Sequence, residues 1–458
     1  MKAAGRGKGN KGLLRDADRQ TASRPAGRFY LRTFGCQMNR HDSELVSGLL
    51  RARGWRRVES EDSADLILLN TCSVRRHPEE RVWGRLHRYR RLKERNPGLI
   101  LGVLGCMARI RSGEIRRRFP EVEVVLGPEN LDRLGEEIAG RRGLRTGEEV
   151  PENFFPVSPD RENRLSAWVT VTRGCDNFCS YCVVPHARGR EVSRPAGEIL
   201  TEVRGLGEQG CREVTLLGQN VNSYRGPGPG GEPVDFPGLL RLLEPVGGIA
   251  RIRFLTSHPR DISPGLVAAV AELEKVCEFL HFPAQSGADP VLARMRRGYT
   301  REDYLERVRN LKAAVPGIAL ASDFIVGFPG ETGEDFARTL DLVEEVSFDQ
   351  IFAFAYSPRP GTAAARLRDD VPPPVKSARL KELFARQKII AEEKNRRLVG
   401  KVLEVLVEGR NPRFPDRGEG RTRTGKPVFF PWKEDLAGQL VPVLIERSTD
   451  LSLYGKIC

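Results

Sequence analysis

The chain has 458 residues, a formal net charge of +14 and 39% hydrophobic residues. This apolar content is enough for several full-sized cores, so the composition excludes a chain that is disordered throughout. No apolar run approaches the roughly 18 residues that a membrane span needs, so we expect no membrane partner. The excess of positive charge favours nucleic acid as a partner, although a basic protein without such a partner would have the same composition.

The N-terminal segment, residues 1–28, is rich in Gly, Lys and Arg and shows no apolar periodicity. We interpret it as a disordered basic tail. This segment lacks the apolar core of a signal peptide. Because disulfides are typical of secreted proteins, the nine cysteines of the chain indicate metal ligation in a reducing compartment instead. We expect a cytoplasmic protein.

One pattern occurs three times in a first domain, residues 29–145. A short apolar run, typical of a buried strand, ends in Gly or Thr and leads directly to a cysteine, and helical patterns fill the intervals. In a parallel sheet the loops after the strands meet at one edge, so the three thiols can converge. A single such cysteine is usually a core residue. Three cysteines at the same position, directly after successive strands, predict instead a three-thiolate iron–sulfur cluster. The runs are 29–35, 66–71 and 99–105, and the cysteines are Cys36, Cys72 and Cys106.

A second cysteine set follows a linker (146–164) and has the spacing C-x3-C-x2-C, formed by Cys175, Cys179 and Cys182. Three thiolates on one loop can hold three irons of a 4Fe-4S cluster and leave the fourth iron open to a small molecule. Zinc sites usually close with a fourth protein ligand, and ferredoxin runs recruit a fourth cysteine. His186 is the only local candidate for a fourth ligand, and we expect it to be a solvent-facing polar residue. The loop resembles that of the radical S-adenosylmethionine (SAM) enzymes.

Strand-like and helix-like stretches alternate over a second domain, residues 165–390. Six such βα units predict a parallel sheet or partial barrel, with polar motifs gathered at the strand carboxyl ends as a cofactor pocket. We expect Cys211 and Cys277 to be structural, and we assign no partner to Cys458. The expected strands are 168–172, 213–218, 251–257, 278–282, 318–326 and 349–356, with helices such as 198–208, 265–276, 303–314 and 334–346.

The C-terminal domain, residues 391–458, follows a charge-rich helix from about 376 to 397 and alternates in β fashion. We predict a small all-β barrel. Basic residues interleaved with aromatic residues suit single-stranded RNA through phosphate pairing and base stacking, although some of the aromatic residues must form the barrel core. The candidate RNA contacts are Arg421, Arg423, Lys426, Phe429, Phe430 and Trp432.

Taken together, residues 28–457 resemble the methylthiotransferase family of radical SAM enzymes. The resemblance is carried by Thr-Phe-Gly-Cys-Gln-Met-Asn at 33–39, Asn-Thr-Cys-Ser-Val-Arg at 70–75, Leu-Gly-Gln-Asn-Val-Asn at 217–222 and Tyr-Ser-Pro-Arg-Pro-Gly-Thr at 356–362. It implies an α/β cluster domain, a radical SAM partial barrel and a C-terminal RNA-binding domain of the TRAM type. Gln37 and Met38 favour the branch that modifies isopentenyladenosine in tRNA.

The resemblance also implies cofactors and partners. Cys175, Cys179 and Cys182 would hold a 4Fe-4S cluster that binds SAM, and Cys36, Cys72 and Cys106 would hold a second 4Fe-4S cluster that carries the sulfur. The implied partners are the anticodon stem-loop of tRNA, a sulfur donor and an electron donor such as flavodoxin or ferredoxin. The candidate SAM contacts are Tyr181, Gln219, Gln285, Asp323 and Gly327.

Three alternatives remain at this point. A related methylthiotransferase could act on threonylcarbamoyladenosine in tRNA or on an aspartate of a ribosomal protein. A non-catalytic RNA-binding protein with iron–sulfur or zinc sites would instead require closed, four-ligand metal sites and would not cleave SAM.

Overall fold

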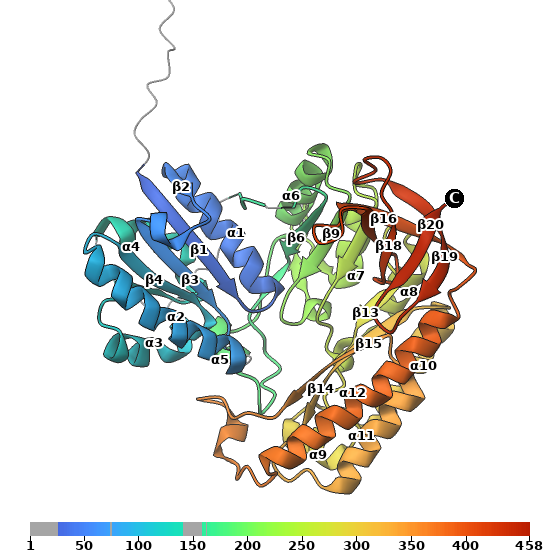
Figure 1. Ribbon diagram of the computed structural model, residues 1–458. Helices are drawn as coiled ribbons and strands as arrows, with labels where there is room; N and C mark the ends of the chain where they lie inside the picture. Colours follow the sequence, from blue (N-terminus) through green and yellow to red (C-terminus); the bar gives the residue numbers. More distant parts are fainter. Residues whose placement is uncertain (1–25, 74–75, 141–157, 162) are drawn as a thin grey trace, which may run out of the picture.

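The structure is a computed structural model, and it describes residues 26–73, 76–140, 158–161 and 163–458. Figure 1 shows an N-terminal α/β unit in blue, a larger α/β unit running from green to orange, and a small β-barrel in red. The predicted basic tail and linker lie largely outside the described residues. Within those residues, no helix combines the length and the apolar character that a membrane crossing requires.

The N-terminal unit is a parallel five-stranded sheet with the order β2-β1-β3-β4-β5. Side chains alternate between its two faces: Leu66 and Leu68 of β3 pack into one apolar core, and Ile67 and Leu69 pack into the other. Both faces are thus covered, as the continuous apolar run predicts. The elements are β1 (Gly27–Phe34), α1 (Gln37–Ala52), β2 (Trp55–Arg57), β3 (Leu66–Thr71), α2 (Arg76–Arg95), β4 (Ile100–Gly105), α3 (Cys106–Arg118), β5 (Val124–Leu126) and α4 (Leu134–Gly140).

The second unit contains six parallel strands in two three-stranded sheets, β12-β9-β6 and β13-β14-β15. An isolated parallel bridge between Ile252 and Val276 joins the two sheets. One continuous apolar core runs between the strands and the surrounding helices. The predicted partial barrel is confirmed. Its strands are β6 (Ser166–Thr170), β9 (Glu213–Leu217), β12 (Arg251–Phe254), β13 (Phe279–His281), β14 (Ala319–Val326) and β15 (Gln350–Ala355).

The helices of this unit begin where the sequence provides caps. Thr300 and Thr332 each form a capping box with an aspartate three residues later, which satisfies backbone N–H groups that the first turn leaves without partners. The helices are α5 (Val184–Arg188), α6 (Ala196–Glu208), α7 (Phe236–Leu243), α8 (Pro264–Glu272), α9 (Asp289–Met295), α10 (Arg301–Ala314), α11 (Gly333–Val346) and α12 (Pro373–Arg396). A two-stranded ribbon of β7 (Thr172–Arg173) and β8 (Val192–Ser193) flanks the second cysteine set.

The C-terminal unit is a closed barrel with the order β16-β17-β18-β20-β19, which confirms the predicted all-β class. Its small core contains Val405, Val428, Val443 and Phe430. Helix α12 leads into it along one side of the partial barrel (Figure 1). The strands are β16 (Val402–Arg410), β17 (Arg417–Thr422), β18 (Pro427–Pro431), β19 (Leu440–Ser448) and β20 (Leu453–Ile457).

Candidate cysteine sites and candidate RNA interface

The first cysteine set lies at the carboxyl edge of three adjacent strands. Cys36 follows β1 and caps α1, Cys72 follows β3, and Cys106 begins α3 directly after β4. A side-chain hydrogen bond joins Cys36 to Cys72 and lowers the pKa of Cys36 to about 6. Cys106 is fully buried, and burial raises the pKa of its thiol, while the charge of Arg188 acts in the opposite direction. The structure therefore brings together the three cysteines that the sequence pattern placed at one edge.

Glycine and asparagine residues fix the backbone that presents these thiols. Gly105 has a φ of +87°, and a Cβ atom there would lie 2.4 Å from Oδ1 of Asn70. Asn70 is fully buried and donates to the backbone oxygen of Asn39 over 2.7 Å and to Oγ of Ser43 over 2.9 Å. The glycine before Cys106 is thus required for space as well as for its conformation. The motif residues Asn39 and Asn70 hold two of the cysteine loops together, a role that sequence analysis did not assign.

The second cysteine set lies on the loop after β7, and its backbone is tightly held. Gly174, directly before Cys175, has a φ of +78°, and a Cβ atom there would lie 1.9 Å from the backbone oxygen of Arg190. The backbone N–H of Cys182 donates to the oxygen of Cys179 over 2.9 Å, which tightens the loop into a turn. Burial, and to a smaller extent the neighbouring Cys179, raise the pKa of Cys182 to about 12. These thiols have the chemistry of buried soft ligands, which become thiolates when they bind metal.

Within the described residues, no three His, Cys, Asp or Glu side chains surround one point closely enough to hold a single metal ion. The fit of the two cysteine sets to iron–sulfur clusters therefore rests on three soft donors per set, on the burial of two of the three in each set, and on the loops that hold them. A cavity of about 270 Å³ adjoins the second set and is lined by Cys179, Cys182, His186 and Arg296, among others. His186 lines this cavity and is exposed, in agreement with the predicted solvent-facing position.

Several buried polar atoms at the strand carboxyl ends of the partial barrel have no hydrogen-bond partner. They belong to Thr172, Ser257, His258, Gln285 and Tyr356, which lie at or after four different strands. Buried polar groups in proteins are normally satisfied, so such a group of exceptions indicates a place for a polar ligand. Burial lowers the pKa of His258 to about 2, so its ring is neutral and can donate or accept. This set fits a ligand such as SAM, which carries an amino group, a carboxylate and ribose hydroxyls.

The predicted SAM contacts have different surroundings. Gln285 has a φ of +70° and a buried Oε1 atom with no partner, so it is well placed for a ligand. Asp323 pairs with His281 over 3.3 Å and is partly exposed. Tyr181 is within 3.4 Å of the guanidinium of Arg297, through its hydroxyl.

Two of the predicted contacts already have structural roles. Oε1 of Gln219 accepts from the backbone N–H of Gly174 over 2.6 Å, so this side chain supports the cysteine loop. Gly327 has a φ of +68°, and a Cβ atom there would lie 2.3 Å from Cγ of Lys376, so this glycine makes room for α12.

The predicted RNA contacts separate into buried, docked and surface residues. Phe430 is 2% exposed and forms part of the barrel core, where a base cannot stack on it. Arg423 pairs with Glu278 over 2.7 Å, and Lys426 pairs with Asp349 over 2.8 Å. These two cations bind the partial barrel rather than solvent. The remaining predicted residues, Arg421, Phe429 and Trp432, are partly or fully exposed.

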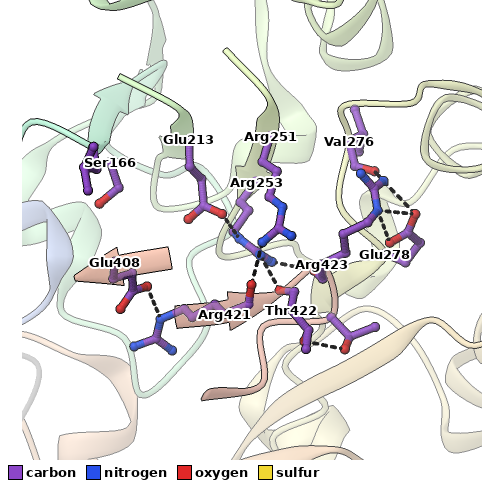
Figure 2. A network of polar contacts seen from close by, with 12 residues as sticks. Ser166, Glu213, Arg251, Arg253, Val276, Glu278, Glu408, Arg421, Thr422 and Arg423 are labelled. Atoms are coloured by element: carbon purple, nitrogen blue, oxygen red, sulfur yellow. Dashed lines mark hydrogen bonds and ion pairs between the residues drawn. The ribbon is translucent and has the colours of Figure 1, made fainter. Parts of the chain in front are cut away.

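The docking of the C-terminal barrel uses two buried arginines that sequence analysis did not single out. Figure 2 shows the side chains of Arg251 and Arg253, both in β12, extending toward the carboxyl end of β17. Arg251 donates to the backbone oxygen of Arg421 over 2.7 Å, and Arg253 donates to that of Thr422 over 2.8 Å. Arg253 also pairs with Glu213 over 2.7 Å. Arg251 and Glu213 are the first residues of β12 and β9, so this contact lies at the amino ends of the strands, away from the cysteine loop.

Comparison with known proteins agrees with this architecture. Residues 28–127 match the model described as uncharacterized protein family UPF0004, residues 169–343 match the radical SAM superfamily, and residues 396–458 match the TRAM domain. A solved radical SAM methyltransferase from Kitasatospora setae, TsrM, has the same fold over 74% of this chain and 77% of its own, with a TM-score of 0.53 and 15% identity. The fold and the matches define this chain as a radical SAM enzyme, which confirms the predicted class and its cofactor types.

Curated relatives narrow the class. Proteins named tRNA-2-methylthio-N(6)-dimethylallyladenosine synthase from Bordetella bronchiseptica, Syntrophotalea carbinolica and Geotalea uraniireducens are 45%, 46% and 47% identical to this chain. The alignments cover 95%, 93% and 94% of this chain and 94%, 99% and 98% of those proteins. The chain belongs to the family of tRNA-2-methylthio-N(6)-dimethylallyladenosine synthases. The predicted methylthiotransferase resemblance is therefore confirmed, whereas the predicted domain boundaries and individual site residues stay predictions.

Proposed function

We propose that this enzyme converts N6-dimethylallyladenosine (isopentenyladenosine) beside the anticodon of tRNA to its 2-methylthio derivative, using SAM and two 4Fe-4S clusters. The observation that carries the proposal is the presence of two separate three-cysteine sets, each at the strand carboxyl ends of its own α/β unit. Cys175, Cys179 and Cys182 would hold the cluster that binds SAM, and Cys36, Cys72 and Cys106 would hold the cluster that carries sulfur.

The target position explains why such cofactors are needed. A C–H bond on an adenine ring has no acidic proton and no leaving group, so acid–base and nucleophilic side chains have nothing to act on. When bound, the clusters and SAM supply the one-electron and sulfur chemistry that this bond requires. The protein supplies thiol ligands held on rigid loops, buried surroundings that exclude water, and neutral polar groups such as Gln285 and His258 that can orient SAM.

The partners follow from the same proposal. The proposed reaction consumes electrons and sulfur, so it implies an electron donor such as flavodoxin or ferredoxin and a sulfur donor. Arg421, Phe429 and Trp432 on the C-terminal barrel remain the candidate RNA contacts. A cation and aromatic faces at a surface suit phosphate pairing and base stacking. We place the enzyme in the cytoplasm, where its tRNA substrate occurs.

The test is nucleoside mass spectrometry on tRNA from a host that lacks its own enzyme of this family, with and without this chain. We expect the 2-methylthio form of isopentenyladenosine to accumulate only when the chain is present. Unmodified isopentenyladenosine in cells whose purified chain carries iron would contradict the substrate assignment. Modified threonylcarbamoyladenosine in the same digest, or a modified ribosomal protein, would identify a different substrate within the class.

A further inference from the structure

One buried arginine lies against each of the two cysteine sets. Arg188 is hydrogen-bonded to Cys106, and Nη1 of Arg297 donates to Sγ of Cys179 over 3.3 Å. Each arginine is 4% exposed. A guanidinium stays charged at every accessible pH, so its burial is costly unless a negative charge lies beside it. The surroundings of the two arginines therefore indicate which anions they face.

Arg297 has neutral oxygen partners. Its guanidinium donates to the backbone oxygen of Pro283 over 2.9 Å and to the hydroxyl groups of Tyr299 and Tyr181 over 3.0 and 3.4 Å. A tyrosine hydroxyl with an ordinary pKa of about 10 is neutral at pH 7, so none of these oxygens carries a counter-charge. Of these hydrogen-bonded groups, the sulfur of Cys179 is the one that would carry negative charge as a ligand of a cluster.

Arg188 connects the two α/β units. It ends α5, six residues after Cys182, but its guanidinium lies in the N-terminal unit, where it pairs with Asp42 over 2.6 Å. Burial acts to lower the pKa of Arg188, and Asp42, Cys106 and Cys36 raise it well above its usual value. The segment that carries the second cysteine set thus places a positive charge beside two cysteines of the first set.

We propose that Arg188 and Arg297 are positioning residues that each offset the negative charge of one iron–sulfur cluster, Arg188 for the Cys36/Cys72/Cys106 set and Arg297 for the Cys175/Cys179/Cys182 set. This inference rests on the proposed function for the identity of the clusters. Three thiolates bring three negative charges to one buried place, and a hydrogen-bonded guanidinium lowers that cost. Net charge and hydrogen bonds to sulfur also set the reduction potential of such clusters. Each arginine therefore raises the potential of its own cluster and leaves the other unchanged.

The test uses full-length chains that keep one cysteine set, with the other set changed to alanine, after anaerobic reconstitution with iron and sulfide. In each background the variants are Arg188→Gln, Arg188→Lys, Arg297→Gln and Arg297→Lys. The matched control is Arg253→Gln, because Arg253 is 8% exposed and pairs with Glu213 far from both cysteine sets. The readout is the midpoint potential from a redox titration followed by electron paramagnetic resonance, with iron content and melting temperature measured alongside.

We expect Arg188→Gln to lower the potential of the first cluster, and Arg297→Gln that of the second, by about 59 mV, a tenfold change in the ratio of reduced to oxidised cluster. Each lysine variant should restore most of this shift because it keeps the charge. If Arg188→Gln fails to hold iron, Arg188→Lys decides: retained iron with a potential near the wild-type value supports the proposal, and loss of iron from Arg188→Lys as well overturns the role of the charge. The proposal would be overturned if one glutamine variant shifted the midpoint potentials of both clusters, or if neither variant shifted any potential.

The readout does not involve tRNA, so it separates this inference from the proposed function. A selective potential shift could be found even if the chain modified a different substrate. Conversely, an enzyme that forms the methylthio nucleoside while both glutamine variants keep wild-type potentials would leave the proposed function standing and remove the role of the arginines.

Discussion

The residues that carry the chemistry are few, and those that hold them in place are more numerous. Gly174 before Cys175 and Gly105 before Cys106 occupy backbone conformations and spaces that exclude a side chain. Gln219 and Asn70 satisfy backbone groups of the same loops. A cysteine spacing identifies ligands, but these neighbouring residues determine whether three thiols point to one place.

Replacement of Gly174 by alanine should prevent the second cysteine loop from closing. The new Cβ atom would lie 1.9 Å from a backbone oxygen, and the left-handed conformation adds about 1–2 kcal/mol of strain. We expect at least half of the iron to be lost after reconstitution in the background that keeps only the second set. Gly197→Ala is the control, because Gly197 lies in α6 with its nearest neighbouring atom 3.9 Å away. Equal iron content in both variants would contradict this account.

Variants of Gln219 can distinguish whether this side chain supports the cysteine loop or binds SAM. If it mainly accepts from the N–H of Gly174, Gln219→Glu keeps the acceptor and should retain iron, whereas Gln219→Ala leaves a buried donor unsatisfied, at a cost of about 1–3 kcal/mol. We expect the alanine variant to lose iron and melt earlier. Normal iron content combined with weakened SAM binding in both variants would instead place Gln219 on the ligand.

At the scale of elements, the amino ends of the partial-barrel strands form a docking surface for the C-terminal barrel. Asp349, directly before β15, pairs with Lys426 of the C-terminal barrel and with Lys394 of α12, over 2.8 and 2.6 Å. Burial acts to raise the pKa of Asp349, but the two ammonium groups outweigh it and hold the pKa below its ordinary value of 3.8. The carboxylate therefore ties three segments together at neutral pH.

Asp349→Asn should weaken this docking. Loss of one partner from a buried ion-pair network costs about 3 kcal/mol, so the variant should melt earlier than the wild type at pH 7. A carboxylate with a lowered folded-state pKa stabilises the fold above its unfolded pKa, and this stability is lost as the pH falls through the folded pKa. The difference in melting temperature should therefore shrink below about pH 3.8. A difference that is the same at pH 7 and pH 3 would contradict the ionic origin.

The sequence predicted the six barrel strands to within a few residues because their apolar runs are bounded by polar motifs at the carboxyl ends. It did not predict the docking of the C-terminal barrel. The alternation Arg-Ile-Arg-Phe at 251–254 looks like a strand with one solvent-facing side, yet both arginines are buried under another domain. A cation that binds a carboxylate of another domain has no local sequence signal. The sequence therefore predicts Arg423 and Lys426 as RNA contacts, whereas in the structure both pair with carboxylates of the partial barrel.

At the scale of the whole molecule, the enzyme places two cysteine sets in separate α/β units and connects them through Arg188 and Asp42. The C-terminal barrel docks at the opposite ends of the partial-barrel strands from the cysteine loop. Under the proposed function, a tRNA that contacts both the C-terminal barrel and the cysteine loop would extend along the length of the partial barrel. In the proposed function, this arrangement separates SAM cleavage at one set from sulfur delivery at the other.

The division of labour between the two sets is the central claim, and one measurement tests it most directly. Reconstituted wild type, Cys179→Ala and Cys72→Ala are incubated with SAM, reductant, a sulfur source and isopentenylated tRNA, and methionine release and methylthio nucleoside are quantified together. We predict that Cys179→Ala abolishes both products, and that Cys72→Ala releases methionine but forms less than about 1% of the nucleoside, since sulfur delivery needs an intact first cysteine set. Sulfur insertion by Cys72→Ala at the wild-type rate would contradict the account.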